Sequence, residues 1–334
     1  MINVSGLSKR YGTHLAVKDV SFNIEKGEVI GFLGPNGAGK STIMNILTGY
    51  LSMTQGKVEI DGFDIVEFPE QAKRRIGYLP EIPPLYTDMK VREYLNFIYD
   101  LKKVKFPKKP HIDEVLRLVG IDNVANRLIK NLSKGYRQRV GFAQALVGNP
   151  DVLILDEPTV GLDPKQIIEI RNLIGRLGKN HTIILSSHIL SEIQAVCKRV
   201  IIINRGEIIA DDTAENLAHR LSDNKTLLAR IVCNEEDMLA TLKTVKGVKS
   251  VTSLGQMESG SYDFVIEPMD GNDIRADIFD RVVSRGKKLL ALNDNRLSLE
   301  QVFLRLTDMD TKEAKELLGT EELTETNTEE EEEA

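Results

Sequence analysis

The period of the apolar pattern changes several times along the chain, and these changes predict the order of its elements. Residues 14–24 alternate apolar and polar positions, which is typical of a strand with one buried face. Residues 28–34 form a continuous apolar strand that runs into a glycine-rich loop. Residues 41–48 then show helical spacing, and strand character returns at 56–65. The amino-terminal part is therefore predicted to contain short strands with turns, a loop and a helix.

The middle of the chain is predicted to be helix-rich first and then to alternate strands with helices. Apolar residues recur at helical spacing over roughly residues 82–147. Beyond them, buried-type strands are predicted at 151–157, 181–188 and 199–211, separated by helices at 165–179 and 189–197. Such alternation indicates a parallel sheet with helices on both faces.

The pattern changes again after residue 222. Four strands are predicted, with one helix between the first and second and another between the third and fourth: strands 225–233, 248–255, 261–268 and 287–294, helices 235–245 and 272–285. The order β-α-β-β-α-β is that of a ferredoxin-like unit. A last helix is predicted from residue 298, and from Gly319 the sequence is rich in Glu and Thr, which predicts disorder.

These patterns divide the chain of 334 residues into three parts. We expect a large α/β domain at 1–222 with a helical subdomain at about 82–147, an α+β accessory domain at 223–310, and an acidic tail at 311–334. The net charge is −6, but eight Glu and no basic residue follow position 320, so the rest sums to about +2. A nearly neutral folded part gives no reason to expect nucleic-acid binding.

Cysteine content and hydropathy indicate the compartment. The two cysteines, Cys197 and Cys233, lie far apart, which fits a reducing environment and disfavours a disulfide framework or a zinc site. The amino terminus lacks the pattern of a signal peptide. The longest apolar runs have the length of strands, whereas a membrane helix needs about 20 apolar residues. We therefore expect a soluble protein, or one held at a membrane by a partner.

A glycine-rich phosphate-binding loop is the strongest chemical motif. Its sequence GPNGAGKST matches G-x-x-x-x-G-K-[ST] between a predicted strand and a predicted helix. Glycines allow backbone N–H groups to surround phosphates at a helix amino terminus. The lysine would meet the β- and γ-phosphates, and the serine hydroxyl is a ligand for Mg²⁺. The residues are Gly34, Pro35, Asn36, Gly37, Ala38, Gly39, Lys40, Ser41 and Thr42.

Two acidic residues end the apolar strand at 151–157. Asp156 is placed to hold Mg²⁺, usually through water. Glu157 could polarise the attacking water as a general base. Both could instead merely cap the following helix, but their combination with a phosphate-binding loop favours catalysis.

Four further positions stand out, and three of them have the chemistry of an anion site. Ser133 and Gly135 open a predicted helix, where a hydroxyl, a small residue and free N–H groups suit an anion. His188 follows an apolar strand and could donate to a γ-phosphate oxygen, although a single histidine is more often structural. Its place at the carboxyl end of a predicted parallel strand favours function. Asp163 precedes a proline and is also a helix N-cap candidate.

In this order the motifs resemble the nucleotide-binding subunit of an ABC transporter, over about residues 2–220. The resemblance implies a P-loop NTPase fold of the ABC cassette type, a mixed sheet with a helical subdomain. It also implies that ATP and Mg²⁺ bind, and that two domains face each other with two ATP molecules between them.

Roles within one ATP pocket follow from the same resemblance. Tyr11 is similar to the aromatic residue that stacks on adenine, and residues 34–42 resemble the Walker A loop. Asp156 and Glu157 resemble the Walker B metal-side acid and the catalytic carboxylate. His188 resembles the switch histidine.

The remaining family positions imply contacts across the dimer. Ser133 and Gly135 resemble signature residues that contact the γ-phosphate held by the partner, and Asp163 resembles the loop that communicates between subunits. Two positions depart from the family pattern. Glu81 stands where glutamine is usual, and a carboxylate there could still serve the metal or simply lie on a loop surface. Lys134 replaces a usual glycine, and we expect it to point away from the phosphate.

Residues 77–95, 132–139 and 298–304 resemble a narrower group, the ATPase subunits of bacterial ABC-2-type exporters, including gliding-motility and multidrug kinds. That group implies a homodimer on the inner face of the cell membrane, joined to a separate permease through the surface near residues 82–105. A soluble ABC-type ATPase acting on nucleic acid or ribosomes is disfavoured, because the chain has one cassette and no sustained heptads between Ser41 and Ser133. A non-hydrolysing regulator is disfavoured because the core catalytic positions are present.

Overall fold

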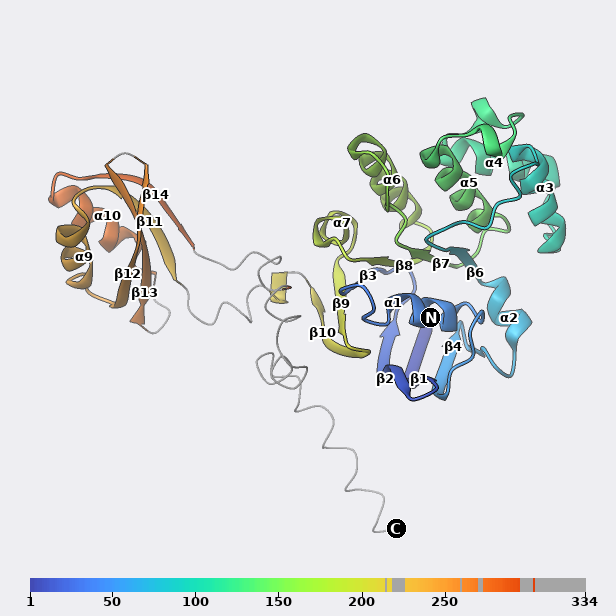
Figure 1. Cartoon of the computed structure of the whole chain (residues 1–334), viewed down its shortest axis with the longest axis horizontal. Helices are drawn as coiled ribbons and strands as arrows, with labels where there is room; N and C mark the ends of the chain where they lie inside the picture. The colour runs from blue at the N-terminus through green and yellow to red at the C-terminus, as the bar shows by residue number, and fades with distance from the viewer. Residues whose placement is uncertain (214, 218–225, 259, 270–272, 295–302, 304–334) are drawn as a thin grey trace, which may run out of the picture. The chain divides into compact units, whose positions relative to one another are not determined.

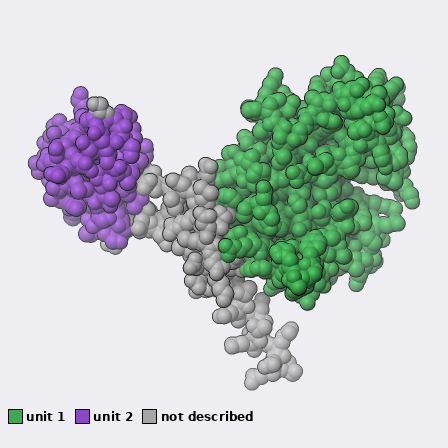
Figure 2. All heavy atoms as spheres, in the orientation of Figure 1, with its two compact units in different colours: residues 1–214, 303–334 green, residues 215–302 purple. Residues whose placement is uncertain are grey.

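The protein is described here by a computed structural model of the chain. The structure describes residues 1–213, 215–217, 226–258, 260–269, 273–294 and 303. It divides into two compact units, one formed by residues 1–214 with 303–334 and the other by residues 215–302 (Figure 2). Each unit has its own hydrophobic core.

The first unit is built on a six-stranded sheet. Its strands are parallel except for an antiparallel pairing of β10 with β9 at one edge. All five residues of β7 are buried, which explains its continuous apolar sequence. The order is β10 (Glu207–Thr213), β9 (Arg199–Asn204), β3 (Val29–Leu33), β8 (Thr182–Ser187), β7 (Val152–Asp156) and β6 (Ile76–Leu79).

A second, antiparallel sheet completes the core of this unit. Helix α1 (Lys40–Leu47) belongs to the same buried cluster as both sheets, through residues such as Ile43 and Met44 (Figure 1). Because α1 packs against both sheets, the position of the loop that precedes it is fixed. The antiparallel sheet contains β2 (His14–Ile24), β1 (Ile2–Tyr11), β4 (Gln55–Ile60) and β5 (Phe63–Asp64).

Helices cover the other parts of the unit. Helices α6 (Pro164–Leu177) and α7 (Leu190–Val196) follow β7 and β8, and Ile193 of α7 packs against Gly31 of β3. Helices α3 (Val91–Leu101), α4 (Lys108–Val119) and α5 (Lys134–Leu146) pack together as a group (Figure 1). Short 3₁₀ turns at Asp122–Val124 and Ile129–Asn131 connect α4 to α5.

Three local features differ from the sequence prediction. The strand predicted at 199–211 is two strands, because Arg205 and Gly206 both have positive φ and form a tight hairpin turn. The sequence also gave no sign of β6, whose four residues are too few to show a clear period. Helix α2 (Pro69–Arg74) was likewise not predicted.

The second unit contains one antiparallel sheet and two helices. The elements follow the order β11 (Leu227–Val232), α9 (Glu235–Lys243), β12 (Val248–Glu258), β13 (Ser261–Pro268), α10 (Arg275–Ser284) and β14 (Lys288–Asp294). The strand order in the sheet is β12-β13-β11-β14. Met238 and Leu242 of α9 and Ile278 and Val282 of α10 are buried in its core.

The helix predicted from residue 298 and the tail predicted to be disordered both lie outside the described residues, apart from Phe303. Each helix within the described ranges is too short or too polar to span a bilayer.

Candidate active site

Glycines in the loop 34–42 allow the chain to pass close to its neighbours. A Cβ on Gly34 would lie 2.3 Å from the Ile203 carbonyl oxygen. Gly39 has φ +108° at the start of α1, and a Cβ there would lie 2.9 Å from the Ala16 carbonyl oxygen. Only glycine fits both positions without moving backbone. The loop therefore joins β3 to α1 in the strand-loop-helix context that the motif requires.

Lys40 lies inside this loop with its ammonium held by oxygen atoms. Its Nζ donates to the carbonyl oxygens of Gly34, at 2.7 Å, and Pro35, at 3.2 Å. The same Nζ lies 3.6 Å from Glu157 Oε1, and both side chains are buried. Burial lowers the pKa of Lys40, and the nearby carboxylates of Glu157 and Asp156 oppose that shift.

Hydroxyl groups from two segments meet at Asp156. Ser41 Oγ donates to Asp156 Oδ1 over 3.2 Å, and Ser186 Oγ donates to the same oxygen over 2.5 Å. Ser186 Oγ also accepts the backbone N–H of Glu157 at 2.9 Å. Ser186 was not predicted as a site residue. The two serines before His188 were the only signal, and serine is common enough that this signal is weak.

The orientation of the Glu157 side chain is set by its left-handed backbone conformation and by a contact with a histidine. Its φ is +46°, a left-handed conformation that costs a residue other than glycine about 1–3 kcal/mol. His188 Nδ1 lies 2.9 Å from Glu157 Oε2. Burial raises the pKa of Glu157, and His188 and Lys40 act in the opposite direction. A buried carboxylate with a raised pKa beside a histidine has the properties of a general base.

A hollow of about 400 Å³ connects these groups. Glu81, which follows the end of β6, faces it together with the loop, the acid and the histidine. Since the carboxyl ends of parallel strands meet at one edge of a sheet, sequence segments far apart converge there. The lining residues are Ala16, Asn36, Gly37, Ala38, Gly39, Lys40, Ser41, Thr42, Glu81, Glu157, Val160 and His188.

Seven predicted site residues do not line this hollow. Three of them, Gly34, Pro35 and Asp156, are hydrogen-bonded to Lys40 or Ser41, which do line it. The other four lie elsewhere in the unit. Tyr11 ends β1 with 48% of its surface exposed, and Lys9 Nζ lies 5.3 Å from the centroid of its ring. Ser133 and Asp163 are the N-caps of α5 and α6, and each accepts a backbone N–H of its own helix. Gly135 lies in the first turn of α5. Ser133 and Gly135 therefore lie outside the hollow that the loop 34–42 of the same chain lines.

Lys134 and Gly135, at the start of α5, both lie close to neighbouring segments. A Cβ on Gly135 would lie 2.6 Å from the Gln166 amide, so a side chain there would displace Gln166 of α6. A Cβ on Gly161 would lie 1.9 Å from Lys134 Nζ. The lysine amine thus lies against the loop that leads to Asp163.

A second buried network of hydrogen bonds links the segment that follows Glu157 to the segment that precedes His188. Glu192 of α7 is 4% exposed, and its Oε2 accepts hydrogen bonds from Thr159 Oγ1 and Ser187 Oγ, at 2.5 and 2.9 Å. Ser187 Oγ also accepts the Ile189 N–H. This carboxylate was not predicted, since only the fold places α7 beside the loop after β7.

Comparison with known proteins identifies the family. Residues 17–160 match the family described as ABC transporter. Over 222 residues, the chain is 40% identical to the bacitracin transport ATP-binding protein BcrA of Bacillus licheniformis, which covers 66% of this chain and 72% of that protein. The chain is an ATP-binding protein of the ABC transporter family.

Similarity in this family extends beyond the first unit. The linearmycin resistance ATP-binding protein LnrL of Bacillus subtilis is 31% identical over 92% of this chain and 98% of its own length. The dimeric structure of MJ0796, a bacterial ABC transporter cassette, matches with a TM-score of 0.59 and 27% identity, over 64% of this chain and 98% of that chain. The expected P-loop fold of the ABC cassette type is confirmed.

This member of the family binds ATP and is an ATPase. A second structure of MJ0796, in a post-hydrolysis state bound to ADP and phosphate, matches with a TM-score of 0.58 and 26% identity, over 64% of this chain and 98% of that one. The hollow beside the loop 34–42 is therefore the candidate site of ATP hydrolysis in this ABC ATPase.

Proposed function

We propose that this ABC ATPase powers an exporter as a homodimer joined to a separate ABC-2-type permease. The separation of Ser133 and Gly135 from the loop 34–42 carries the dimer part of the proposal, because one chain then has two incomplete anion sites. Relatives named for bacitracin transport, lantibiotic transport and linearmycin resistance support export. The protein would lie on the inner face of the membrane through its permease.

Within one pocket, we assign the charged groups by their positions. Lys40 places a positive charge among the loop N–H groups, where it would meet the β- and γ-phosphates. Glu157 would accept a proton from the attacking water, and His188 would orient Glu157 and donate toward the γ-phosphate. Phosphoryl transfer needs positioning and charge stabilisation, which these groups provide.

A Mg²⁺ site fits the oxygen atoms beside the loop. Ser41 Oγ and Asp156 Oδ1 lie 3.2 Å apart, and Glu81 faces the same hollow. Hydroxyl and carboxylate oxygens are the ligands that Mg²⁺ prefers, and the bound ion would neutralise phosphate charge. Ser41 would contact the ion directly, while Asp156 and Glu81 would hold its water ligands.

The second subunit would complete each pocket. Ser133 and Gly135 at the start of α5 would present N–H groups to the γ-phosphate held by the partner's loop. Asp163 would carry the contact between subunits, whereas the half-exposed Tyr11 would stack on the adenine of the ATP bound by its own chain. Ser133, Gly135 and Asp163 lie outside the hollow of their own chain, as a composite site requires.

An apolar groove on the helix-rich part fits a permease. Its volume is about 510 Å³, and Tyr50, Ile82 and Leu101 line it with 83%, 82% and 65% of their surfaces exposed. Large apolar side chains exposed together mark an interaction site. Five of its lining residues, between Ile82 and Lys102, belong to the region near residues 82–105 expected to receive the permease.

The second unit is best interpreted as a ferredoxin-like accessory domain. Its β-α-β-β-α-β order and its antiparallel strand order β12-β13-β11-β14 are those of that fold. The likeness to LnrL along 98% of that protein's length supports a role shared with full-length relatives.

Affinity purification from native membranes tests the proposed function. We expect a tagged chain to copurify with a multi-helix membrane protein and to release phosphate from ATP with Mg²⁺. Nuclease-sensitive copurification with RNA would instead favour a soluble ATPase acting on nucleic acid. Complete absence of phosphate release from the purified complex would favour a non-hydrolysing regulator.

The start of α5 allows a paired test of the composite site. Gly135→Asp is expected to reduce ATP hydrolysis by at least about tenfold, because the new side chain meets Gln166 and adds a negative charge where a phosphate is expected. Lys134→Gly is expected to change the rate by less than about threefold, since its amine lies against Gly161. Phosphate release at saturating ATP measures both. The reverse order would show that Lys134 is the residue facing ATP.

A further inference from the structure

The connection between α3 and α4 is rich in lysines, and none of them lines the candidate site of ATP hydrolysis. Residues 101–110 contain five lysines and no acidic residue. Lys102 points inward, where its Nζ donates to the Val147 carbonyl at 2.9 Å. Lys108 pairs with Asp100. Lys103, Lys105 and Lys109 are exposed, and none has a hydrogen-bond or ion-pair partner among the residues that the structure describes.

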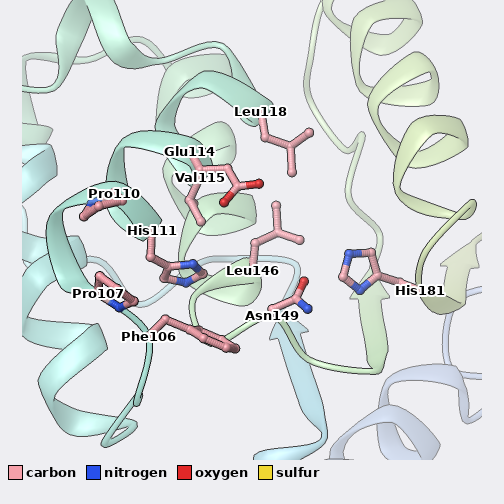
Figure 3. Close-up of a pocket in the computed structure, with 10 residues that line it drawn as sticks. All are labelled: Phe106, Pro107, Pro110, His111, Glu114, Val115, Leu118, Leu146, Asn149 and His181. Carbon is pink, nitrogen blue, oxygen red and sulfur yellow. The ribbon is translucent and has the colours of Figure 1, made fainter.

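The backbone of this lysine turn, residues 102–109, is held in place from inside the protein. The Tyr99 hydroxyl donates to the Phe106 carbonyl. The Phe106 ring lies beneath His111, with 5.4 Å between ring centroids, at the wall of a pocket of about 350 Å³ (Figure 3). His111 Nε2 in turn accepts the Gly148 N–H at 3.0 Å. The three exposed lysines are thus presented on a fixed support.

Apolar surface and a hollow adjoin the charged turn. Leu101, 65% exposed, ends α3 just before it and also lines the apolar groove proposed for the permease. A hollow of about 520 Å³ also adjoins the turn and is lined by Arg92, Asn96, Lys108, Lys109 and Asp113. The acidic groups nearby are mostly engaged, since Asp113 pairs with Arg92. The Glu114 side chain, which lines the pocket of Figure 3, has no hydrogen-bond or ion-pair partner among the described residues.

We propose that the lysine turn is a direct contact with the headgroups of anionic membrane lipids. Long lysine stems allow the ammonium groups to reach lipid phosphates while exposed Leu101 meets the interface. Each lysine near an anionic leaflet favours association, and several on one surface act together. The turn borders the groove proposed for the permease, so the membrane would lie on that side. The contact itself requires only protein and lipid and thus goes beyond the proposed function.

Vesicle cosedimentation of the purified full chain tests this contact. We expect binding to vesicles of phosphatidylglycerol and phosphatidylcholine, loss of that binding at high salt, and none to phosphatidylcholine alone. The variant Lys103→Gln/Lys105→Gln/Lys109→Gln should bind about a hundredfold more weakly, at about fivefold per lysine. Gln keeps a Cβ at Lys103, whose φ is +51°, so the turn is not strained further.

A matched triple variant controls for total charge. Lys26, Lys179 and Lys198 are also exposed in the first unit, and changing them to Gln alters net charge equally. Both triple variants should hydrolyse ATP like the parent chain, which shows that they fold. Equal loss of vesicle binding in both, or no binding by the parent chain, would overturn the proposal. So would unchanged vesicle binding with lost permease copurification, since the turn would then contact protein.

Discussion

Glu157→Gln is expected to lower the rate of ATP hydrolysis by about 10²–10⁴-fold while ATP still binds. The amide has the shape of the carboxylate and can keep the 2.9 Å contact with His188 Nδ1, but it cannot take a proton from water. Since binding survives and turnover stops, the ATP-bound dimer should accumulate. Phosphate release and size-exclusion chromatography with ATP and Mg²⁺ measure the two effects.

Glu67→Gln is a suitable control for this variant. Glu67 is an exposed residue of the same unit. Its substitution by Gln makes the same chemical change as Glu157→Gln, but away from the hollow. It should hydrolyse ATP at the parent rate and show no added dimer. Rapid turnover by a monomeric Glu157→Gln protein would refute both the assignment of the base and the composite site.

Lys40→Ala is expected to reduce hydrolysis by at least about 10²–10³-fold and to weaken ATP binding as well. The change removes the charge that the loop holds between the Gly34 and Pro35 carbonyls, where it would meet the phosphates. It also leaves Glu157, 7% exposed, without the cation at 3.6 Å. Fluorescent-nucleotide titration and phosphate release measure binding and turnover separately.

Two further variants serve as controls for Lys40→Ala. Lys40→Met keeps most of the buried stem and should fail as completely as Lys40→Ala, because the charge is what matters. Lys26→Ala removes an exposed lysine and should leave turnover unchanged. Circular dichroism checks that each variant is folded. Substantial hydrolysis by folded Lys40→Met would contradict the assigned role of the loop lysine.

Short-range chemistry explains what could be predicted from the sequence. The loop 34–42 requires glycines, a lysine and a hydroxyl within nine consecutive residues, so its function is encoded locally. The strands at β3, β7 and β8 were predictable because strands buried on both faces are continuously apolar. The β6 strand was not, because four residues give no period and its pairing with β7 depends on distant sequence.

Long-range contacts explain what the sequence left open at the site. Glu81 was ambiguous between a metal role and a surface loop, and only the placement of β6 beside β7 brings it to the hollow. Ser186 and Glu192 acquire roles through partners about 30 residues away, Asp156 and Thr159. No local pattern distinguishes such a serine or glutamate from those on a surface.

The sequence by itself therefore determined the family, the nucleotide and the chemical kind of each motif, because these depend on neighbouring residues. The tertiary structure decided which motifs share one pocket. It placed Lys40, Glu157 and His188 at one sheet edge and kept Ser133 and Gly135 away from it. Strand order and helix packing set these distances, and both depend on contacts between residues far apart in the chain.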